Sequence, residues 1–555
     1  MEKRVVVFLV LSLAVILGYD LLLKQLGLLP PPPDAVQEPP SEVAGTHSGG
    51  PETSPSVSAG GPSGSSASVK SNASRQLSPA DQSQPFERTV MLETDLIRVG
   101  LDAHGGVISS WELKRHHTAP PEEKPVQLVH QGAKFKGPLS ISTADAALDK
   151  ALREGLYAIE TDFTSLDNAH PVGHATLRFA ASGLTVLKRL TFHQGSYLVD
   201  VAVTIEGMTG GYDVVLGTNF GIVEWGDGFI GLIGSASLVD GKVEKETPDT
   251  ELERKGAVQW VALQDKYFLS VLMPQGASAA VAKKEGEKLV SAAARMSPAG
   301  DGATRALQLY AGPKEYDTLR SLNVGLEETI DFGWFIFGSW SVVKAVAKPI
   351  FYVLRTINEY THNYGVTIIL LTMGIKLLFV PLQFKSYKSM KQMQMVQPKV
   401  LALQEKYKDD RDKLNKELIK LYRDHKVNPV GGCLPMVLQM PVFVALFNIL
   451  YMTIDLRQAP FIGWITDLSV QDPYYVLPII MGATMVIQQK ITPTTMDPTQ
   501  AKIMLILPVF MTFLFINFPA GLVLYWLTNN VLTIGQQVLT DRLYANRPFI
   551  IEPAK

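Results

Sequence analysis

Five long apolar blocks in the last third of the chain constrain its fold more than any other feature. Blocks of about 20 apolar residues can cross a hydrocarbon core about 30 Å thick as α-helices. A sixth apolar stretch, residues 5–23, follows Lys3 and Arg4 at the N-terminus. Together the blocks predict six transmembrane helices. The five C-terminal blocks are residues 364–382, 434–452, 474–489, 503–518 and 521–539.

The N-terminal stretch allows two alternatives. A charged start before a short apolar core also fits a cleaved signal peptide. No small-x-small cleavage site precedes Pro30, and we therefore favour an uncleaved transmembrane anchor over residues 1–29. Under either alternative the next part of the chain is exported. Residues 30–85 consist largely of Pro, Ser, Gly and Ala, a composition that predicts a disordered linker because it cannot bury enough apolar area.

Residues 86–330 change to short alternating stretches, which predict an exported all-β sandwich domain. In residues 197–205 every second side chain is apolar, as on one face of a strand. Residues 95–101 and 107–113 flank a Gly-containing turn and predict a hairpin. A closing helix is expected over residues 314–322. Within residues 331–363, aromatic and lysine side chains predict an amphipathic helix in the outer membrane interface.

Basic residues near the ends of the blocks predict the orientation in the membrane. Residues 385–426 carry twelve Lys and Arg, whereas residues 455–472 carry only Arg457. Both termini are therefore expected in the cytoplasm. The basic segment, residues 385–428, predicts a cytoplasmic helical hairpin. From charge alone it could bind lipid phosphates or ribosomal RNA, or be only a solvated loop that sets topology.

Lys376 lies inside the first of the five C-terminal blocks, about 14 Å from the basic segment at about 1.5 Å per residue. A charge at such depth costs about 2.5–3.5 kcal/mol on insertion scales. A snorkelling or ion-paired lysine is the structural alternative, but the C-terminal blocks hold no Asp or Glu as a partner. We therefore predict a hydrated cavity around the amine. The candidate wall residues are Thr372, Gln439 and a largely polar stripe at helical spacing in the last block, which consists of Tyr525, Thr528, Asn529, Leu532 and Gln536.

Signals of bond-making chemistry are missing from the sequence. There is no Walker A sequence, no H-E-x-x-H and no G-x-S-x-G. The single cysteine, Cys433, excludes an intramolecular disulfide and a cysteine-cluster metal site. The net charge of −2 argues against attraction of the whole chain to DNA. No enzyme activity, catalytic residue, cofactor or metal is expected.

Four short sequences resemble the signatures of the YidC membrane protein insertase family. They are residues 428–441, 456–460, 472–475 and 518–525, and their order and spacing match over residues 331–539. The domain over residues 86–330 resembles the family's Gram-negative periplasmic domain, whose fold is similar to sugar-mutarotase sandwiches. The resemblance implies a five-helix core, residues 364–540, around a groove open to cytoplasm and lipid, and a short cytoplasmic tail, residues 541–555.

The resemblance also implies an activity. Such a protein is an insertase and chaperone that inserts nascent membrane proteins into the bacterial inner membrane and helps them to fold, without hydrolysing a nucleotide. It acts alone or with the Sec translocon, and its cytoplasmic loops meet the ribosome or targeting machinery. Lipids are further partners.

Family positions carry over to individual residues of this chain. Thr372, Lys376 and Tyr525 match groove positions, and Phe443 and Met481 match apolar positions that contact the passing helix. Two departures stand out. Lys376 replaces the usual arginine, and a desolvated lysine can lose its proton whereas arginine effectively cannot. Trp526 replaces a second tyrosine.

Two other function classes stay open at the level of sequence. One is an ion-coupled solute transporter with Lys376 as the titrating group, although no inverted repeat supports it. The other is an exported sugar-binding or sugar-converting enzyme, formed by the β domain on a membrane anchor.

Overall fold

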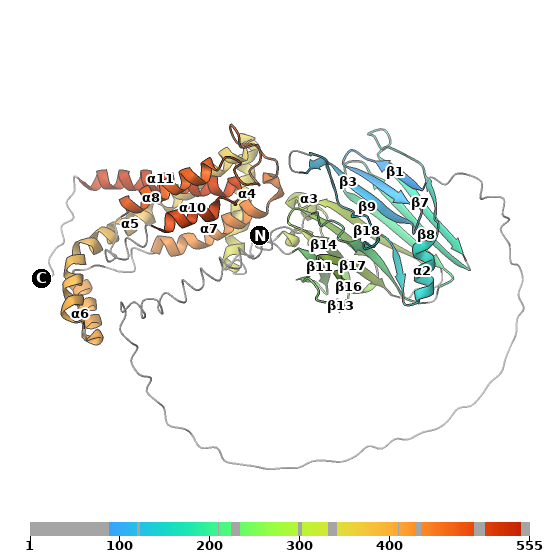
Figure 1. Ribbon diagram of the computed structural model, residues 1–555, viewed down its shortest axis with the longest axis horizontal. Helices are drawn as coiled ribbons and strands as arrows, with labels where there is room; N and C mark the ends of the chain where they lie inside the picture. The colour runs from blue at the N-terminus through green and yellow to red at the C-terminus, as the bar shows by residue number, and fades with distance from the viewer. Residues whose placement is uncertain are drawn as a thin grey trace, which may run out of the picture. The chain divides into compact units, whose positions relative to one another are not determined.

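The computed structural model describes residues 88–118, 123–181, 183–208, 210–223, 233–297, 302–330, 341–408, 410–425, 427, 434–492 and 506–545. The predicted anchor, residues 1–29, and linker, residues 30–85, lie outside the described residues, as does the tail beyond residue 545. Figure 1 shows strands gathered in residues 89–313 and helices in the C-terminal region.

Three antiparallel sheets form the β domain, residues 89–330, as the sequence predicts. The largest has the order β12 (Lys242–Lys245), β11 (Gly234–Val239), β14 (Val258–Gln264), β15 (Phe268–Pro274), β18 (Thr304–Pro313), β9 (Leu198–Glu206), β8 (Leu184–His193), β7 (Val172–Ala181) and β6 (Ala158–Thr161). The second has the order β13 (Glu251–Lys255), β16 (Ala277–Gly286), β17 (Leu289–Met296), β10 (Tyr212–Thr218) and β5 (Ile141–Thr143). The third has the order β1 (Thr89–Glu93), β2 (Ile97–Asp102), β3 (Val107–His117) and β4 (Pro125–Gln127).

Alternation along the strands builds a shared core between the sheets. In β9 the side chains of Val199, Val201, Val203 and Ile205 are buried, which confirms the strand face expected from the sequence. Burying a valine or isoleucine side chain stabilises the fold by about 1.5–3 kcal/mol. The third sheet joins this core through Trp111, whose indole N–H donates to a β18 carbonyl at 3.0 Å.

The expected hairpin is present as β2 and β3, which pair antiparallel around residues 103–106. Gly106 has a φ of +57°, and a Cβ there would stand 2.5 Å from the Tyr157 ring. Only glycine combines that backbone conformation with so close an approach. The turn therefore depends on this residue.

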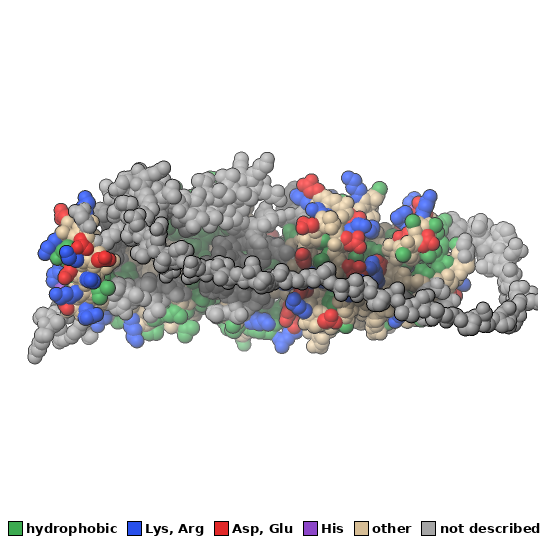
Figure 2. All heavy atoms as spheres, turned by 90° about the horizontal axis from the view of Figure 1, so that it is seen from below, with side chains coloured by type: hydrophobic (Ala, Val, Ile, Leu, Met, Phe, Trp, Pro, Cys, Tyr) green, Lys and Arg blue, Asp and Glu red, His purple; other side chains and the backbone are tan. Residues whose placement is uncertain are grey.

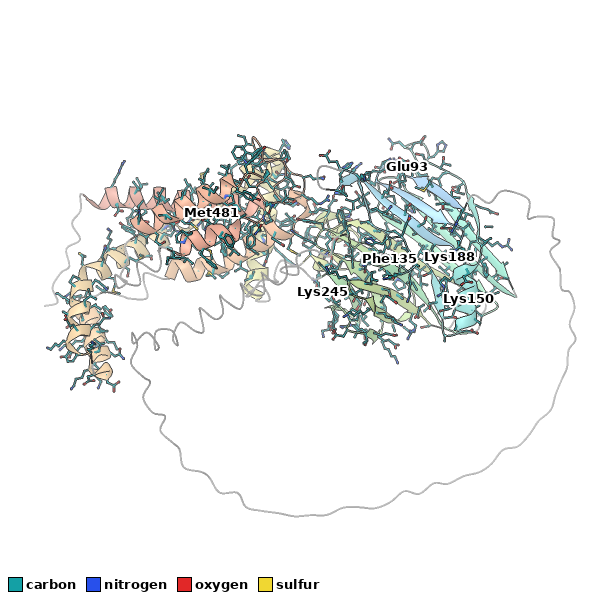
Figure 3. All side chains as sticks on the ribbon, in the orientation of Figure 1. Glu93, Phe135, Lys150, Lys188, Lys245 and Met481 are labelled. Atoms are coloured by element: carbon teal, nitrogen blue, oxygen red, sulfur yellow. The ribbon has the colours of Figure 1, made fainter. Side chains whose placement is uncertain are left out.

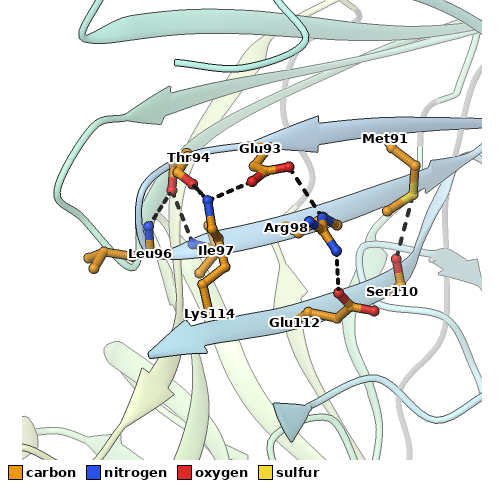
Figure 4. A network of polar contacts seen from close by, with 9 residues as sticks. All are labelled: Met91, Glu93, Thr94, Leu96, Ile97, Arg98, Ser110, Glu112 and Lys114. Carbon is orange, nitrogen blue, oxygen red and sulfur yellow. Dashed lines mark hydrogen bonds and ion pairs between the residues drawn. The ribbon is translucent and has the colours of Figure 1, made fainter. Parts of the chain in front are cut away.

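Charged side chains pair across the outer face of the third sheet, where Figure 4 shows the network. The Glu93 carboxylate accepts from Lys114 at 2.6 Å and from Arg98 at 3.3 Å. The Thr94 hydroxyl oxygen accepts two backbone N–H bonds, each 3.1 Å long, from the residues that start β2. This network holds the β1–β2 turn in one conformation.

The helices are α2 (Ala146–Glu154), α3 (Tyr316–Ser321), α4 (Ser341–Thr361), α5 (Tyr364–Lys406), α6 (Arg411–Asp424), α7 (Leu434–Met452), α8 (Val476–Ile491), α10 (Leu507–Phe515) and α11 (Ala520–Ala545), with 3-10 turns η2 (Leu326–Thr329) and η4 (Ile454–Leu456). The closing helix α3 agrees with the expectation for residues 314–322. Helix α5 differs from the expectation, because it continues through residue 385 to its end without a break. The predicted span and the first arm of the hairpin are thus one helix.

In the part of the chain that the structure describes, fewer helices are long and apolar enough to cross a membrane than the sequence blocks predict. Among the described residues only α5 is both long and apolar enough, while residues 438–452 and α8 are shorter apolar helices. Helix α11 has 26 residues, but Asn529, Asn530, Gln536 and Gln537 lower its hydropathy. The six-helix count is therefore left as a proposal.

Lys188 is the most unusual core residue of the β domain. It lies on β8 with an exposed fraction of 0%, and its amine donates to the carbonyls of Gly106 and Leu139 at 2.8 Å each. The amine also lies 4.8 Å from the centre of the Tyr157 ring. Burial lowers the pKa of Lys188 to about 7. Figure 3 labels Lys188 among the sheets and Lys150 on α2.

We predict that Lys188 makes the stability of the β domain depend on pH. An unfolded lysine has a pKa of about 10.4, so above pH 7 the unfolded state binds more protons than the folded state. The free energy of unfolding should therefore rise between pH 7 and pH 10, by at most about 1.4 kcal/mol per pH unit. Urea unfolding of the isolated β domain measures it.

Replacing Lys188 should remove this rise in the free energy of unfolding with pH. Lys188→Met should flatten the pH dependence, whereas Lys150→Met, a matched change of an exposed lysine, should leave it as in the unchanged domain. An equally steep rise in the Lys188→Met domain would assign the effect to other groups.

Candidate functional site

A cleft of about 710 Å³ lies among helices α5, α7, α8, α10 and α11. These helices lie side by side in Figure 1. Amides, hydroxyls and methionines make up most of its wall, with one lysine and four aromatic side chains. The lining residues are Lys376, Gln383, Ser386, Tyr387, Met390, Gln439, Met440, Phe443, Met485, Gln488, Gln489, Thr492, Leu507, Pro508, Tyr525, Trp526, Asn529, Asn530, Thr533, Gln536, Gln537 and Thr540.

Lys376 is the only charged residue in the described lining of the cleft, and its amine is hydrogen-bonded to a hydroxyl. Its amine donates to the Thr533 hydroxyl oxygen at 2.8 Å, and its side chain is largely buried, with 7% exposed. That hydroxyl donates its own proton to the carbonyl of Asn529, one turn earlier, at 2.6 Å. A lone pair of the oxygen is thereby directed to the amine. Within the described ranges, no carboxylate forms an ion pair with Lys376.

Amide side chains of α11 connect the cleft wall to the neighbouring helices. Gln439 of α7 donates to the Asn529 side chain at 3.4 Å, and Asn530 donates to the Thr484 hydroxyl of α8 at 3.3 Å. Gln537 donates to the carbonyl of Ile491 at 2.6 Å. These bonds hold α7 and α8 on two sides of α11.

Aromatic rings close one end of the cleft. Phe443 lies with its ring centre 6.2 Å from Tyr525 and 5.0 Å, edge to face, from Trp526. Trp526 also packs edge to face on Phe515 at 4.6 Å. Edge-to-face pairs of this kind contribute about 0.5–1.5 kcal/mol beyond the area that they bury.

Asp541, a carboxylate of α11, follows the lining residue Thr540 and contacts two side chains of α5. The Tyr387 hydroxyl donates to the Asp541 carboxylate, and the Lys391 amine lies 3.5 Å from the same carboxylate. These contacts connect the end of α11 to the extension of α5. Asp541 itself does not line the cleft.

The structure brings most of the candidate residues together. Four of them lie outside the lining. Thr372 and Thr528 donate to carbonyls of their own helices, at 2.6 and 2.8 Å, and Met481, labelled in Figure 3, is fully buried in the helical core. Leu532, from the predicted polar stripe, also lies outside the lining. The candidates that line the cleft are Lys376, Gln439, Phe443, Tyr525, Trp526, Asn529 and Gln536.

Several lining residues were missed by sequence reasoning. Thr533 follows Asn529 by four positions, so the helical period that selected the stripe could have found it. Tyr387 and Met390 were missed because the span was expected to end before residue 385. Met485 and Gln488 carry no local signal, since only the packing of α8 shows which side faces the cleft.

The hairpin formed by the end of α5 and by α6 has a small core of its own. Val396, Val400 and Val427 are buried there, with Met393 and Tyr422 packed against them. Figure 2 shows Lys and Arg side chains mixed with Asp and Glu over its surface. In the part of the chain that the structure describes, no three His, Cys, Asp or Glu side chains are grouped so as to hold a metal ion.

Comparisons with known proteins agree with this architecture. The family model described as "60Kd inner membrane protein" matches residues 356–547, and that described as "YidC periplasmic domain" matches residues 89–353. Membrane protein insertase YidC of Syntrophus aciditrophicus is 38% identical, with 98% of this chain and 100% of the relative covered. That of Geotalea daltonii is 37% identical, with 98% and 99% covered.

Solved structures were compared as well. A crystal structure of an active YidC insertase covers 81% of this chain and 92% of its own, with a TM-score of 0.35 and 16% identity. A galactose mutarotase related enzyme from Lactobacillus acidophilus covers 40% of this chain and 97% of its own, with a TM-score of 0.26 and 10% identity. The enzymes among the structural neighbours cover only the β domain.

Two family models and full-length relatives thus agree on one assignment. The models are those of an inner membrane protein and of a periplasmic domain, and the relatives are named as insertases rather than as enzymes. The chain belongs to the YidC family of membrane protein insertases.

Proposed function

We propose that this protein inserts nascent membrane proteins into the inner membrane through the cleft around Lys376 and helps them to fold. The observation that carries the proposal is the buried amine, which is hydrogen-bonded to a hydroxyl in a cleft lined with amides. A buried charge without a carboxylate partner is expensive in a dry interior. Water in the cleft would solvate the Lys376 amine and so reduce this cost.

The proposed topology has six spans. The N-terminal anchor, residues 1–29, is the first, and α5, α7, α8, α10 and α11 form the five-helix core, residues 364–540. The twelve Lys and Arg of residues 385–426 place the hairpin in the cytoplasm, together with both termini. The β domain is then periplasmic, and α4 lies in the outer interface between the two.

The proposed path divides the substrate between two environments. The polar flank of the nascent chain enters the wet cleft, while its apolar stretch slides along the lipid-facing side. About 20 apolar residues at roughly 0.3–0.6 kcal/mol each provide about 6–12 kcal/mol of partition free energy. This supply drives insertion without nucleotide hydrolysis, because the cleft shortens the distance that polar groups travel through hydrocarbon.

The same free energy limits the substrates. One charge at the bilayer centre costs about 2.5–3.5 kcal/mol, so an exported flank with more than a few charges exceeds the supply. We propose that such substrates need the Sec translocon as a partner. The basic hairpin and its methionines offer a surface for the ribosome, targeting machinery or lipid phosphates.

Site-specific crosslinking tests the path directly. A photo-crosslinking residue at 443 or 525, both in the cleft wall, should capture a stalled nascent membrane protein. A photo-crosslinking residue at 372 should not capture it. Thr372 does not line the cleft, and its hydroxyl donates to a carbonyl of its own helix. Equal capture from all three positions would contradict a path through the cleft.

Removing the amine should impair insertion of acidic substrates. Lys376→Ala should slow the insertion of a small substrate with an acidic flank by roughly tenfold, the scale of one hydrogen bond to a charged group. Protease protection in proteoliposomes measures it, at equal protein levels. Lys388→Ala, an exposed lysine of the same helix outside the cleft, is the control. Unchanged insertion by the Lys376→Ala protein would exclude a role for the charge, though not for the cleft.

Thr533 should act by positioning that amine. Thr533→Val removes the hydroxyl acceptor and should reduce insertion of the acidic substrate more than that of a neutral one, whereas Thr533→Ser should restore both. Thr528→Val is the matched control, since its hydroxyl bonds only its own helix. An equal loss for acidic and neutral substrates would indicate a packing defect instead.

A further inference from the structure

The β domain contains a second cavity, of about 440 Å³, far smaller than a protein partner would need. It is lined by the β1–β2 turn, the end of β3, the turn between β8 and β9, one residue of β18, and α3 with its flanks. Its volume is that of ordinary small-ligand pockets, about 300–1,000 Å³. The polar groups in its wall therefore indicate which class of small ligand it can bind.

Asp95 fixes the rim of this pocket and is already paired. One carboxylate oxygen accepts from the backbone N–H of Gly195 at 2.7 Å, and the other accepts from Arg115 at 3.2 Å. The turn before β2 is thereby joined to the turn before β9. Since the Arg115 charge is matched by Asp95, the pair leaves the pocket without a free positive charge.

Glu315 supplies the negative charge of the pocket lining. One oxygen of its carboxylate accepts from the Thr318 hydroxyl at 2.9 Å. No ion pair to Glu315 occurs within the described parts of the chain. His116 also lines the pocket, but burial lowers its pKa to about 4, so its ring is neutral at pH 7. Arg115 and Glu315 are the charged residues of the described lining, and Asp95, next to it, pairs with Arg115, so the three charges sum to −1.

Tyr197 is a buried side chain whose polar end has no partner. It is 7% exposed, and its ring packs edge to face on Tyr310 at 6.2 Å. The absence of a side chain at Gly312 makes room for this ring, because a Cβ there would stand 2.9 Å from it. The Tyr310 hydroxyl donates to the carbonyl of Pro313 at 2.7 Å, whereas the Tyr197 hydroxyl has no hydrogen bond to any described residue.

The negative charge of Glu315 acts on the Tyr197 hydroxyl. Burial first, and then Glu315, raise the pKa of Tyr197 to about 12. The phenol is therefore protonated at neutral pH, and its oxygen has lone pairs to accept a hydrogen bond. The pocket thus combines a free carboxylate oxygen, a hydroxyl acceptor and two aromatic rings.

We propose that this pocket binds a primary ammonium group. An ammonium has three N–H donors and no acceptor, which complements Glu315 and the Tyr197 hydroxyl. Aromatic rings attract cations further. An anion would meet the Glu315 carboxylate, and the cation of the described lining, Arg115, is already paired with Asp95. The ammonium could come from a small free amine or from an ethanolamine lipid head group. The proposal does not depend on the insertion activity.

Ligand-observed NMR titration of the full-length protein in phosphatidylcholine nanodiscs tests the site. Ethanolamine should bind with a dissociation constant of roughly 1–10 mM, within the limit for so few atoms. Choline, which has the charge but no N–H donors, should bind at least about threefold more weakly. N-acetylethanolamine and maltose, which are neutral, should not bind. Binding of maltose in place of ethanolamine, or no binding of ethanolamine, would overturn the proposal.

Two variants locate the binding. Glu315→Gln should weaken ethanolamine binding at least about tenfold, and Tyr197→Phe about fivefold, from the loss of a charged and of a neutral hydrogen bond. Glu160→Gln, an exposed carboxylate of β6 outside the pocket, should leave it unchanged. Thermal unfolding checks that each variant is folded. If the Glu315→Gln protein is not folded, the Tyr197→Phe protein alone tests whether ethanolamine binds in this pocket. Unweakened binding by a folded pocket variant would overturn the assignment.

The lipid composition of the nanodiscs then separates the two sources. If head groups occupy the pocket, replacing part of the phosphatidylcholine by phosphatidylethanolamine should raise the apparent dissociation constant of ethanolamine by competition. If the natural ligand is a free amine, the constant should not change. Either result supports an ammonium site and identifies its source.

Discussion

The hydrogen bond between Lys376 and Thr533 sets the conditions for the rest of the helical region. An ammonium has three donors, and within the described residues only one of them has a protein partner. The others need water or a polar ligand, because an unsatisfied donor beside apolar side chains costs about 1–3 kcal/mol, and more when charged. The helices around the amine must therefore leave space and carry polar groups. The amides of α11 meet this need, and they also make α11 too polar to be counted with α5 by hydropathy.

The placement of the acidic group follows from the same constraint. Asp541 lies on α11 beyond the cleft, where it accepts from Tyr387 and faces Lys391. A carboxylate next to Lys376 would pair with the amine and satisfy it permanently. The charge would then no longer favour water or a passing acidic group. Because Asp541 lies outside the cleft lining and pairs with side chains of the α5 extension, the Lys376 amine stays available while the ends of α5 and α11 stay joined.

The periodicity of the sequence predicted those structural features that depend on a single strand, hairpin or helix. The buried face of β9 and the β2–β3 hairpin follow from alternation and from a glycine turn, and the depth of Lys376 follows from counting residues. Parts that depend on packing between elements could not be predicted. Thr528 and Thr533 lie on the same helix, but only the approach of α5 decides that Thr533 meets the amine. The β domain could likewise be recognised from its strands, whereas its pocket depends on turns that are far apart in the sequence.

Lys188 and Lys376, two of the three buried lysines among the described residues, show why burial alone does not define a site. Lys188 has two carbonyl acceptors and an aromatic ring within reach and lines neither the cleft nor the β-domain pocket, so its amine is satisfied by the fold and has nothing left to bind. Lys376 is almost as buried, yet it has a single hydroxyl partner and borders a cleft of about 710 Å³. Two features therefore distinguish a structural lysine from one that is available to a ligand. They are the number of protein groups that already bind the amine and the open space beside it.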